Sequence, residues 1–456
     1  MTEHTDYLIS ILYHLVWPFG DLVTPIITMH SFLGALFFIS LLVTFAAARP
    51  YTAPVQKRGS FKVERVKNAA FNGHSGTFQL NKALAKYGMP IPPTLSAALE
   101  ARKKKGASTS TSTTSSASGV SAASNSTDES GTVSATPESG DSEFLAPISI
   151  GGQSMNMDFD TGSSDLWVFN TQLSTKSQAG HTNFDPTKSS SFSLLQGASF
   201  SISYGDGSGA AGNVGTDTVN IGGASVTSQA VELATAVSSS FVEDTSSNGL
   251  VGLAFSKLNT VQPNQQKTFF DNVMSDLAEP VFTADLKHAT AGAYEFGAID
   301  STKFNGSISW AAINTTNGFW QFSSTKFAVG SGASQANTDG QAIADTGTTL
   351  LLVNSAVASA YYSQVSGAAN DEEAGGVTFP CNSDLPDLSV DIGGAYMATI
   401  PGSLINFTAV DAAGTTCYGG VQATTSDLQI YGDILFKSQF VAFNGGNNSI
   451  GMAPHS

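Results

Sequence analysis

Charged side chains are scarce in this chain of 456 residues. Asp, Glu, Lys and Arg together account for 12% of it, about half of what globular proteins usually contain, and residues 141–456 contain no arginine. A nucleic-acid-binding protein needs a basic face, so we expect no nucleic-acid partner. Apolar residues make up 41% of the chain, which is enough for a sizeable core.

Cysteine and histidine are also few. The chain has two cysteines, Cys381 and Cys417, and only His181, His288 and His455 follow residue 105. No His and Cys cluster has the spacing of a metal site, so we expect no metal and no other cofactor. No G-x-S-x-G motif is present, which argues against a serine hydrolase. In a secreted protein the two cysteines would form one disulfide.

The net charge of −16 conceals two regions of opposite charge. Residues 49–105 contain twelve basic and two acidic residues, a balance of +10, whereas residues 141–456 contain eight lysines and 28 acids, a balance of −20. Such regions attract each other, and acid weakens the attraction because carboxylates lose their charge near pH 4. The pattern favours a basic segment that binds an acidic body; two unrelated solvated surfaces are the alternative.

The N-terminal region has the features of a secretion signal. Residues 32–47 form an apolar run that ends in small residues and is short for a membrane span. We therefore expect residues 1–48 to be a signal peptide, with 1–28 a mis-called start upstream of Met29. The alternative is an uncleaved N-terminal anchor. A cleaved signal predicts a secreted, extracellular protein without stable membrane association.

Two further segments precede the acidic body. Residues 49–105 are basic and partly helical in pattern, and they contain the possible processing site Lys57-Arg58. Residues 106–141 consist almost entirely of Ser, Thr, Ala and Gly, a composition that cannot bury enough surface to fold. We interpret residues 49–105 as a propeptide and 106–141 as a linker, with the mature N-terminus within or near the linker.

From residue 142 onward, short alternating runs are separated by Gly-Gly, as in SIGGQSMNMDF, VNIGGASVTSQAVEL and SVDIGGAYMATI. Gly-Gly between alternating runs is typical of hairpins, because a type I′ turn needs positive φ at both central residues. The pattern predicts an all-β fold to the C-terminus. Two helices are expected to interrupt it, near 265–277 and 355–365.

An internal repeat lies within this region. An Asp-Thr-Gly turn begins at Asp160 and a second at Asp345; each follows an apolar strand and is followed by two hydroxyl residues and another apolar strand. An apolar segment with a central glycine comes 92 residues after the first aspartate, at Gly252, and 87 residues after the second, at Gly432. The repeat predicts two related lobes, 142–312 and 313–456.

The aspartates of the two turns could act together in acid–base catalysis. If they face each other across a two-fold axis, their carboxylates lie in contact, cannot both ionise, and share one proton. One carboxylate can then take a proton from water while the other donates to a carbonyl oxygen. A single Asp-Thr-Gly would be an ordinary turn, but the pair indicates a catalytic site; a decayed relative that kept only the fold is the alternative.

These motifs resemble those of a known family. FDTGSSDLWVF, SYGDGS, GLVGLAF, ADTGTTLLLV and IYGDILFKSQFVAFN are similar to the fungal pepsin-like aspartic proteases of the endothiapepsin and aspergillopepsin type. The resemblance covers roughly residues 142–453 and extends more weakly to NKALAKYGMPIP in the basic segment; residues 1–28 have no counterpart. It implies a bilobal pepsin-like fold of two pseudo-two-fold-related β lobes with a few short helices.

The resemblance also implies roles for individual residues. Asp160 and Asp345 match the catalytic aspartates, and Lys86 and Tyr87 match a pair that covers them in the zymogens. Cys381 and Cys417 match a disulfide of the C-terminal lobe. The residues that match support of the catalytic turns are Thr161, Gly162, Ser163, Thr346, Gly347 and Thr348. The residues that match substrate-binding positions, including the flap at 204–208, are Tyr204, Gly205, Asp206, Ser208, Phe241, Leu250 and Thr349.

The function implied is that of a secreted acid endopeptidase made as a zymogen. It would prefer large apolar residues around the scissile bond and accept Lys before it, through Asp206. Its partners would be protein and peptide substrates and pepstatin-type inhibitors, and we expect a monomer. The sequons at Asn305, Asn314, Asn406 and Asn447 could carry glycans. A catalytically silent pepsin-fold binding or inhibitor protein is the alternative.

Overall fold

A computed structural model describes residues 61–64, 75–106, 144–204, 208–245, 247–338 and 340–456. The expected signal peptide, the Lys57-Arg58 site, nearly all of the linker and the flap residues Gly205 and Asp206 lie outside these ranges. Within them, strands predominate and helices are short, so the all-β prediction is confirmed. Each described helix is too short or too polar to cross a bilayer.

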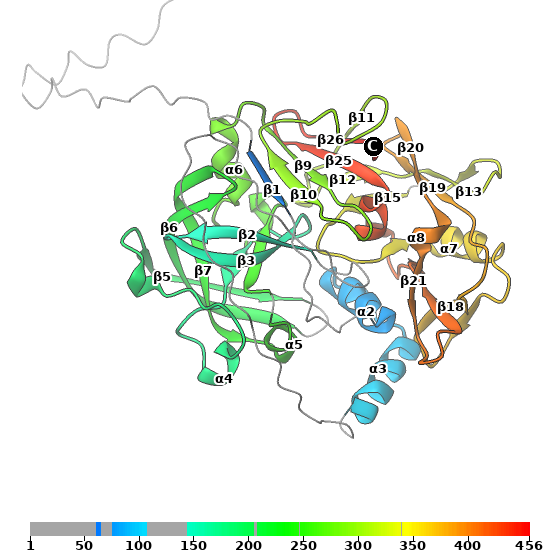
Figure 1. Ribbon diagram of the computed structural model, residues 1–456, viewed down its shortest axis with the longest axis horizontal. Coiled ribbons are helices and arrows are strands. Elements are labelled where there is room, and N and C mark those ends of the chain that lie inside the picture. Colours follow the sequence, from blue (N-terminus) through cyan, green and yellow to red (C-terminus); the bar gives the residue numbers. More distant parts are fainter. Residues whose placement is uncertain (1–60, 65–74, 107–143, 205–207, 246, 339) are drawn as a thin grey trace, which may run out of the picture. The chain divides into compact units, whose positions relative to one another are not determined.

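The first half of the body is built on a seven-stranded sheet (Figure 1). Its strands, in spatial order, are β2 (Leu145–Ile150), β3 (Gln153–Asp160), β8 (Gly249–Gly252), β4 (Leu166–Val168), β7 (Ala224–Val237), β6 (Gly209–Ile221) and β5 (Ser193–Ser203). The hairpin turns between β2 and β3 and between β6 and β7 have positive φ at both glycines of Gly151-Gly152 and Gly222-Gly223. This is the geometry that the Gly-Gly pattern predicts.

The second half repeats the central part of this arrangement in a five-stranded sheet. Its strands, in spatial order, are β12 (Gln321–Ser323), β15 (Gln341–Ala344), β24 (Leu428–Tyr431), β16 (Leu351–Val353) and β23 (Val421–Ala423). In each half the strand before the Asp-Thr-Gly turn pairs in parallel with the apolar strand of the later segment, as β3 with β8 and β15 with β24. The strand after the turn pairs with that same segment in antiparallel fashion.

A six-stranded sheet joins the two halves. Its strands, in spatial order, are β1 (Phe61–Glu64), β10 (Ala293–Phe296), β9 (Val281–Asp285), β25 (Gln439–Asn444), β26 (Ser449–Pro454) and β11 (Ser309–Ala312). The pairing of β9 with β25 links the two halves. Across this pairing the rings of Phe282 and Phe443 stack, with their centroids 4.5 Å apart. The sheet therefore fixes the two halves, and the turns they carry, relative to one another.

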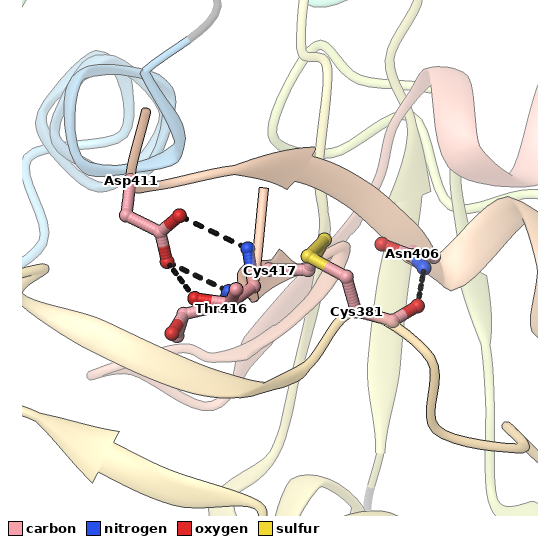
Figure 2. The surroundings of a disulfide bond; sticks show 6 residues. Cys381, Asn406, Asp411, Thr416 and Cys417 are labelled. Atoms are coloured by element: carbon pink, nitrogen blue, oxygen red, sulfur yellow. Dashed lines mark hydrogen bonds between the residues drawn. A yellow bond between two sulfur atoms is a disulfide. The ribbon is translucent and has the colours of Figure 1, made fainter. Parts of the chain in front are cut away.

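Two smaller sheets complete the second half. One contains β14 (Gln335–Ala336), β13 (Lys326–Val329), β19 (Leu388–Ile392) and β20 (Tyr396–Ile400). The other contains β17 (Ala369–Asp371), β18 (Gly376–Pro380), β22 (Thr416–Gly419) and β21 (Asn406–Ala409). In the latter, a disulfide joins Cys381 to Cys417 (Figure 2). Asn406 donates a hydrogen bond to the Cys381 carbonyl oxygen, and Asp411 accepts one from the Thr416 amide (Figure 2).

Among the described residues of the body, helical segments are fewer than strands, and the longest of them, α7 (Ser355–Tyr362), has 8 residues. The helix expected near 265–277 is α6 (Phe269–Val273) followed by the 3-10 turn η3 (Met274–Asp276), and the one expected near 355–365 is α7. The other short helices and turns are α4 (Thr175–Gln178), α5 (Ser239–Glu243), α8 (Gly402–Ile405), α9 (Asp433–Phe436), η1 (Pro186–Lys188) and η2 (Ser256–Leu258).

The basic segment contributes two helices, α2 (Gly76–Lys86) and α3 (Pro93–Gly106), drawn in blue in Figure 1. The apolar face of α2, with Leu80 and Leu84, packs against Leu350 and Tyr418 of the second half. The approach is close: a Cβ added at Gly76 would lie 2.1 Å from the Tyr418 ring, so only glycine fits there. Burial of these side chains holds α2 against the body and directs its C-terminal end toward the two turns.

Candidate active site

Each Asp-Thr-Gly turn holds its carboxylate in the same way. Gly162 N donates to Asp160 Oδ1 at 2.8 Å, and Ser163 Oγ donates to Asp160 Oδ2 at 2.6 Å. In the second turn, Gly347 N donates to Asp345 Oδ1 at 3.0 Å and Thr348 Oγ1 donates to Asp345 Oδ2. Both carboxyl groups are buried, Asp160 at 1% exposure and Asp345 at 0%. The backbone and hydroxyl donors thus fix the orientation of both carboxylates.

The two turns are cross-linked by their threonines. Thr161 N donates to Thr346 Oγ1 at 3.1 Å, and Thr346 N donates to Thr161 Oγ1 at 2.9 Å. Each hydroxyl donates in turn to the strand before the other turn, Thr161 Oγ1 to Ala344 O and Thr346 Oγ1 to Phe159 O. The four bonds are related by an approximate two-fold exchange, as the internal repeat predicts. They bring the two carboxyl groups to one place.

Lys86, the last residue of α2, lies between the two carboxyl groups. Its Nζ is 2.7 Å from Asp160 Oδ1 and 3.0 Å from both oxygens of Asp345. The neighbouring Tyr87 donates from its hydroxyl to Asp345 Oδ2 at 2.6 Å. Both side chains come from the basic segment and occupy the space in front of the carboxylates.

The electrostatics of this cluster follow from burial and from the close charges. Burial lowers the pKa of Lys86, but Asp160 and Asp345 more than offset this and raise it. Burial raises the pKa of Asp160, which Lys86 partly offsets and Asp345 reinforces. For Asp345, Lys86, Thr348 and Tyr87 together outweigh burial and lower the pKa to about 2. The two carboxyl groups therefore differ in proton affinity, as expected of a pair in which one ionises first.

An apolar cluster borders the Asp160 side of the site. Trp167 Nε1 donates to the Tyr204 hydroxyl at 3.3 Å, and Phe241 packs edge-on against both rings, 4.9 Å from Trp167 and 5.6 Å from Tyr204. Leu250 belongs to the same cluster. Tyr204 N donates to Ser208 O at 2.8 Å, which closes the base of the hairpin between β5 and β6. Four predicted substrate-binding residues thus lie together, whereas Gly205 and Asp206 lie outside the described residues.

Four residues that line a cavity at the site were not predicted from the sequence: Lys82, Asp158, Asp244 and Ser247. A cavity of about 20 Å³ beside Lys86 is lined by Lys82, Lys86, Asp158, Asp160, Tyr204, Phe241, Asp244, Ser247, Leu250 and Gly347. Asp158 stands two positions before Asp160 on β3, so strand alternation could have placed both on one face. Gln79 accepts a hydrogen bond from Thr349 Oγ1 at 3.0 Å, a contact between the basic segment and a predicted substrate-binding residue. No sequence pattern indicates that contact.

Among the described residues, no three His, Cys, Asp or Glu side chains are grouped closely enough to hold a metal ion. The chemistry available at the site is that of two carboxyl groups with different proton affinities, in a buried position that both halves of the body complete.

Comparison with known proteins agrees with this geometry. The family model described as eukaryotic aspartyl protease matches residues 143–455. The chain is 46% identical to an aspergillopepsin A-like aspartic endopeptidase of Aspergillus fumigatus, over 93% of this chain and 99% of that protein. It is 44% identical to penicillopepsin-1 of Penicillium rubens, over 90% and 95%, and 46% identical to endothiapepsin of Cryphonectria parasitica, over 85% and 87%. The chain therefore belongs to the eukaryotic aspartyl protease family, as an aspartic endopeptidase of the fungal pepsin-like type.

Proposed function

We propose that Asp160 and Asp345 are the catalytic pair of a secreted acid endopeptidase that is made as an inactive precursor. The observation that carries the proposal is that one ammonium, Lys86 Nζ, lies within 3.0 Å of both carboxyl groups. A small polar group can thus contact both carboxyls at once. In the processed enzyme we assign that position to the attacking water.

The mechanism follows from two carboxyl groups that lie close enough to share one proton. The ionised carboxylate takes a proton from the water, and the protonated one donates to the scissile carbonyl oxygen, so that a tetrahedral intermediate forms without a covalent bond to the enzyme. The donors from Gly162, Ser163, Gly347 and Thr348 hold the carboxylates in place during this exchange. Holding both reactants in position accounts for a large part of the expected rate gain.

The basic segment is the inhibitor in this proposal. Lys86 and Tyr87 take up the hydrogen-bonding capacity of the catalytic pair, and the packing of α2 on Tyr418 holds them there. Acid protonates the carboxylates, which removes the charge that binds Lys86. The strongly opposite charges of residues 49–105 and 141–456 support the same view, because acid weakens their attraction as well.

The substrate side of the proposal is a preference for large apolar residues around the scissile bond. The cluster of Trp167, Tyr204, Phe241 and Leu250 offers apolar surface beside Asp160. We extend the proposal to Lys before the scissile bond through Asp206. The protein is proposed to act as a secreted, extracellular monomer that pepstatin-type inhibitors block, with Cys381–Cys417 as its structural disulfide.

Digestion of haemoglobin or casein at about pH 3–4, with and without pepstatin, tests the proposal. An acid endopeptidase cleaves both proteins and stops when pepstatin is added. A folded protein without activity after removal of the basic segment would favour the silent binding protein instead. N-terminal sequencing of secreted material locates the processing site, and material that still carries residues 1–48 would contradict the signal-peptide assignment.

A further inference from the structure

A second pair of carboxyl groups is buried near the first Asp-Thr-Gly turn. Asp165 lies just after that turn, at 1% exposure, and Glu232 lies on β7 at 0% exposure. On β7, Glu232 stands opposite Trp167 in the pairing with β4. Acidic side chains are almost never fully buried unless they are paired, so these two require an explanation that the proposed catalytic chemistry does not supply.

In each of the two carboxyl groups, one oxygen accepts hydrogen bonds from neighbouring residues. Asn259 Nδ2 donates to Asp165 Oδ1 and to Glu232 Oε1, at 3.0 Å in both cases. Thr260 donates to the same Asp165 oxygen, from its amide at 2.8 Å and from its hydroxyl at 3.1 Å. The remaining oxygens, Asp165 Oδ2 and Glu232 Oε2, are buried and receive no N–H or O–H donor from the described part of the chain. Because one nitrogen, Asn259 Nδ2, lies 3.0 Å from an oxygen of each group, the two carboxyl groups are held close together.

Two ionised carboxylates this close repel each other in a buried position, and neither can donate a hydrogen bond to the other, because each is an acceptor only. One proton between them supplies the missing donor. We propose that Asp165 and Glu232 share a proton in the folded protein and act as positioning residues that keep the Asp160 half of the site in shape only while that proton is present.

The surroundings place the proton on Glu232. Burial, followed by the charge of Asp165, raises the pKa of Glu232 well above its usual range. Burial also raises the pKa of Asp165, but the hydrogen bonds from Thr260 offset part of the effect. The titratable groups that act on the pair are Asp160, on the neighbouring turn, and Tyr204, at the end of β5. Lys257, on η2 beside the Asn259 loop, instead donates to the Thr316 carbonyl oxygen.

Loss of the shared proton would disturb the Asp160 half of the site through residues in direct contact with the pair. Two negative charges would then face each other between β7 and the exit of the Asp160 turn, in a region without a water-exposed outlet for either side chain. Asn259 Nδ2 also donates to Ser164 O at 3.2 Å, so the same loop holds the turn. The strand partner of Glu232 is Trp167, which donates to Tyr204. The link to activity rests on the proposed function; the link to stability does not.

The shared proton makes the folded protein less stable as the pH rises. In the unfolded chain both carboxyl groups ionise above about pH 4–5, whereas the folded protein keeps one proton. The folded state therefore binds more protons, and stability falls as the pH rises. The folding equilibrium constant loses about a factor of ten per pH unit until the folded-state proton is also released.

The test uses two full chains that both carry Asp345→Asn to prevent self-cleavage. One of them also carries Glu232→Gln, and the other keeps Glu232. The Gln amide can donate to Asp165 while its oxygen still accepts from Asn259, so no proton is needed. Urea unfolding at about pH 5, 6 and 7 gives the ratio of the two folding constants. We expect this ratio to rise about tenfold per pH unit in favour of Glu232→Gln. The matched control, Glu243→Gln on α5, removes an exposed carboxyl group and should leave the ratio constant.

A ratio that does not change with pH, or that follows the Glu243→Gln control, overturns the proposal. If Glu232→Gln fails to fold, Asp165→Asn replaces it, because the Asn oxygen can accept from Thr260 while its amide donates to Glu232, and the same tenfold rise is expected. A second readout uses the active chain: after incubation at about pH 7 and return to about pH 4, Glu232→Gln should retain more peptide cleavage than the unsubstituted enzyme. If no peptide is ever cleaved, the proposed function fails while the unfolding ratio still decides this inference.

Discussion

Thr161 and Thr346 exchange hydrogen bonds in both directions across a sequence separation of 185 residues: each backbone N–H donates to the other threonine's hydroxyl oxygen. Both side chains are buried, and each hydroxyl also donates to a carbonyl oxygen of the opposite strand. The separation of the two carboxyl groups is therefore set by these two residues rather than by the aspartates, whose like charges repel.

Thr161→Val should weaken this connection. The valine has a similar shape but leaves the buried Thr346 N–H and the Ala344 carbonyl oxygen without their partner, at a cost of about 1–3 kcal/mol for each such group. Displacement of the turn should also lower kcat/KM by roughly tenfold or more. Chemical denaturation and peptide kinetics measure the two effects. Thr161→Ser, which keeps the hydroxyl, is the control; equal losses in both variants would show that the hydrogen bonds are not the cause.

Asp345→Asn tests the proposed catalytic role directly. The amide cannot ionise, so the pair loses one of its two carboxyl groups, and peptide cleavage should fall by a factor of roughly 10³ or more. The fold should remain, because the Asn oxygen can still accept from Gly347 or Thr348. Casein digestion in acid measures the activity, with the exposed Asp384→Asn as a charge-matched control. Turnover near that of the unsubstituted enzyme would remove Asp345 from the mechanism.

Lys86→Met tests the inhibitory contact and its pH dependence. Lys86 and its neighbours lower the pKa of Asp345 to about 2, so this contact stabilises docking of α2 above about pH 4 and is lost as the pH falls toward about 2. The raised pKa of Lys86 extends the contact upward beyond neutral pH.

Without the ammonium, conversion of the full chain to its processed form should no longer require strong acid and should be measurable at about pH 6. Gel analysis of the conversion rate across pH gives the result. The exposed Lys188→Met, which keeps the catalytic contacts, serves as the control and should convert only in acid. A conversion profile of Lys86→Met that coincides with this control would contradict the inhibitory role.

Removal of the disulfide by Cys381→Ala with Cys417→Ala should destabilise the folded state. The bond closes a loop with a sequence separation of 36, and its loss should lower the free energy of unfolding by roughly 3–4 kcal/mol in the chain-entropy model. Urea unfolding in the Asp345→Asn background measures the difference. The unsubstituted chain treated with reductant should show the same loss; if reduction leaves the midpoint unchanged, the bond does not contribute as expected.

Asp206→Ser tests the proposed acceptance of Lys before the scissile bond. A carboxylate facing the pocket would pair with the Lys ammonium, so the substitution should lower kcat/KM for Lys substrates selectively, by roughly tenfold. Matched peptides with Lys or Leu before the bond measure the ratio. Phe241→Leu, which alters the apolar cluster beside Asp160, should affect the Leu peptide at least as much. An unchanged ratio in Asp206→Ser would leave the Lys preference without its proposed residue.

Several features of the site were predictable from local sequence. The Gly-Gly turns required positive φ at both positions, and Gly151 and Gly152 have it. The two Asp-Thr-Gly turns and their later apolar segments were visible as a repeat, and the pairing of β3 with β8 and of β15 with β24 follows from it. Lys86 and Tyr87 were identified through resemblance alone, because nothing in a helix-forming segment indicates which lysine reaches a site 74 residues away.

The acidic composition was more difficult to interpret. It indicated a negatively charged body, but it did not reveal that Asp158, Asp217 and Glu232 are buried. Burial of a carboxyl group depends on donors that lie far away in sequence, as Asn259 does from Asp165. Asp165 stands within the motif FDTGSSDLWVF, but nothing in that motif indicates that its side chain is buried, and Asn259 stands in none of the quoted motifs.

The sequence by itself determined the β architecture, the duplicated turns and the family, because each depends on residues that are neighbours along the chain or repeat at a fixed spacing. Only the tertiary structure decided where Lys86 lies, how Thr161 meets Thr346, and that Asp165 and Glu232 face one another with too few donors for two charges. The physical reason is that proton affinity and hydrogen-bond satisfaction are set by the atoms that surround a group, and in this fold those atoms come from distant strands.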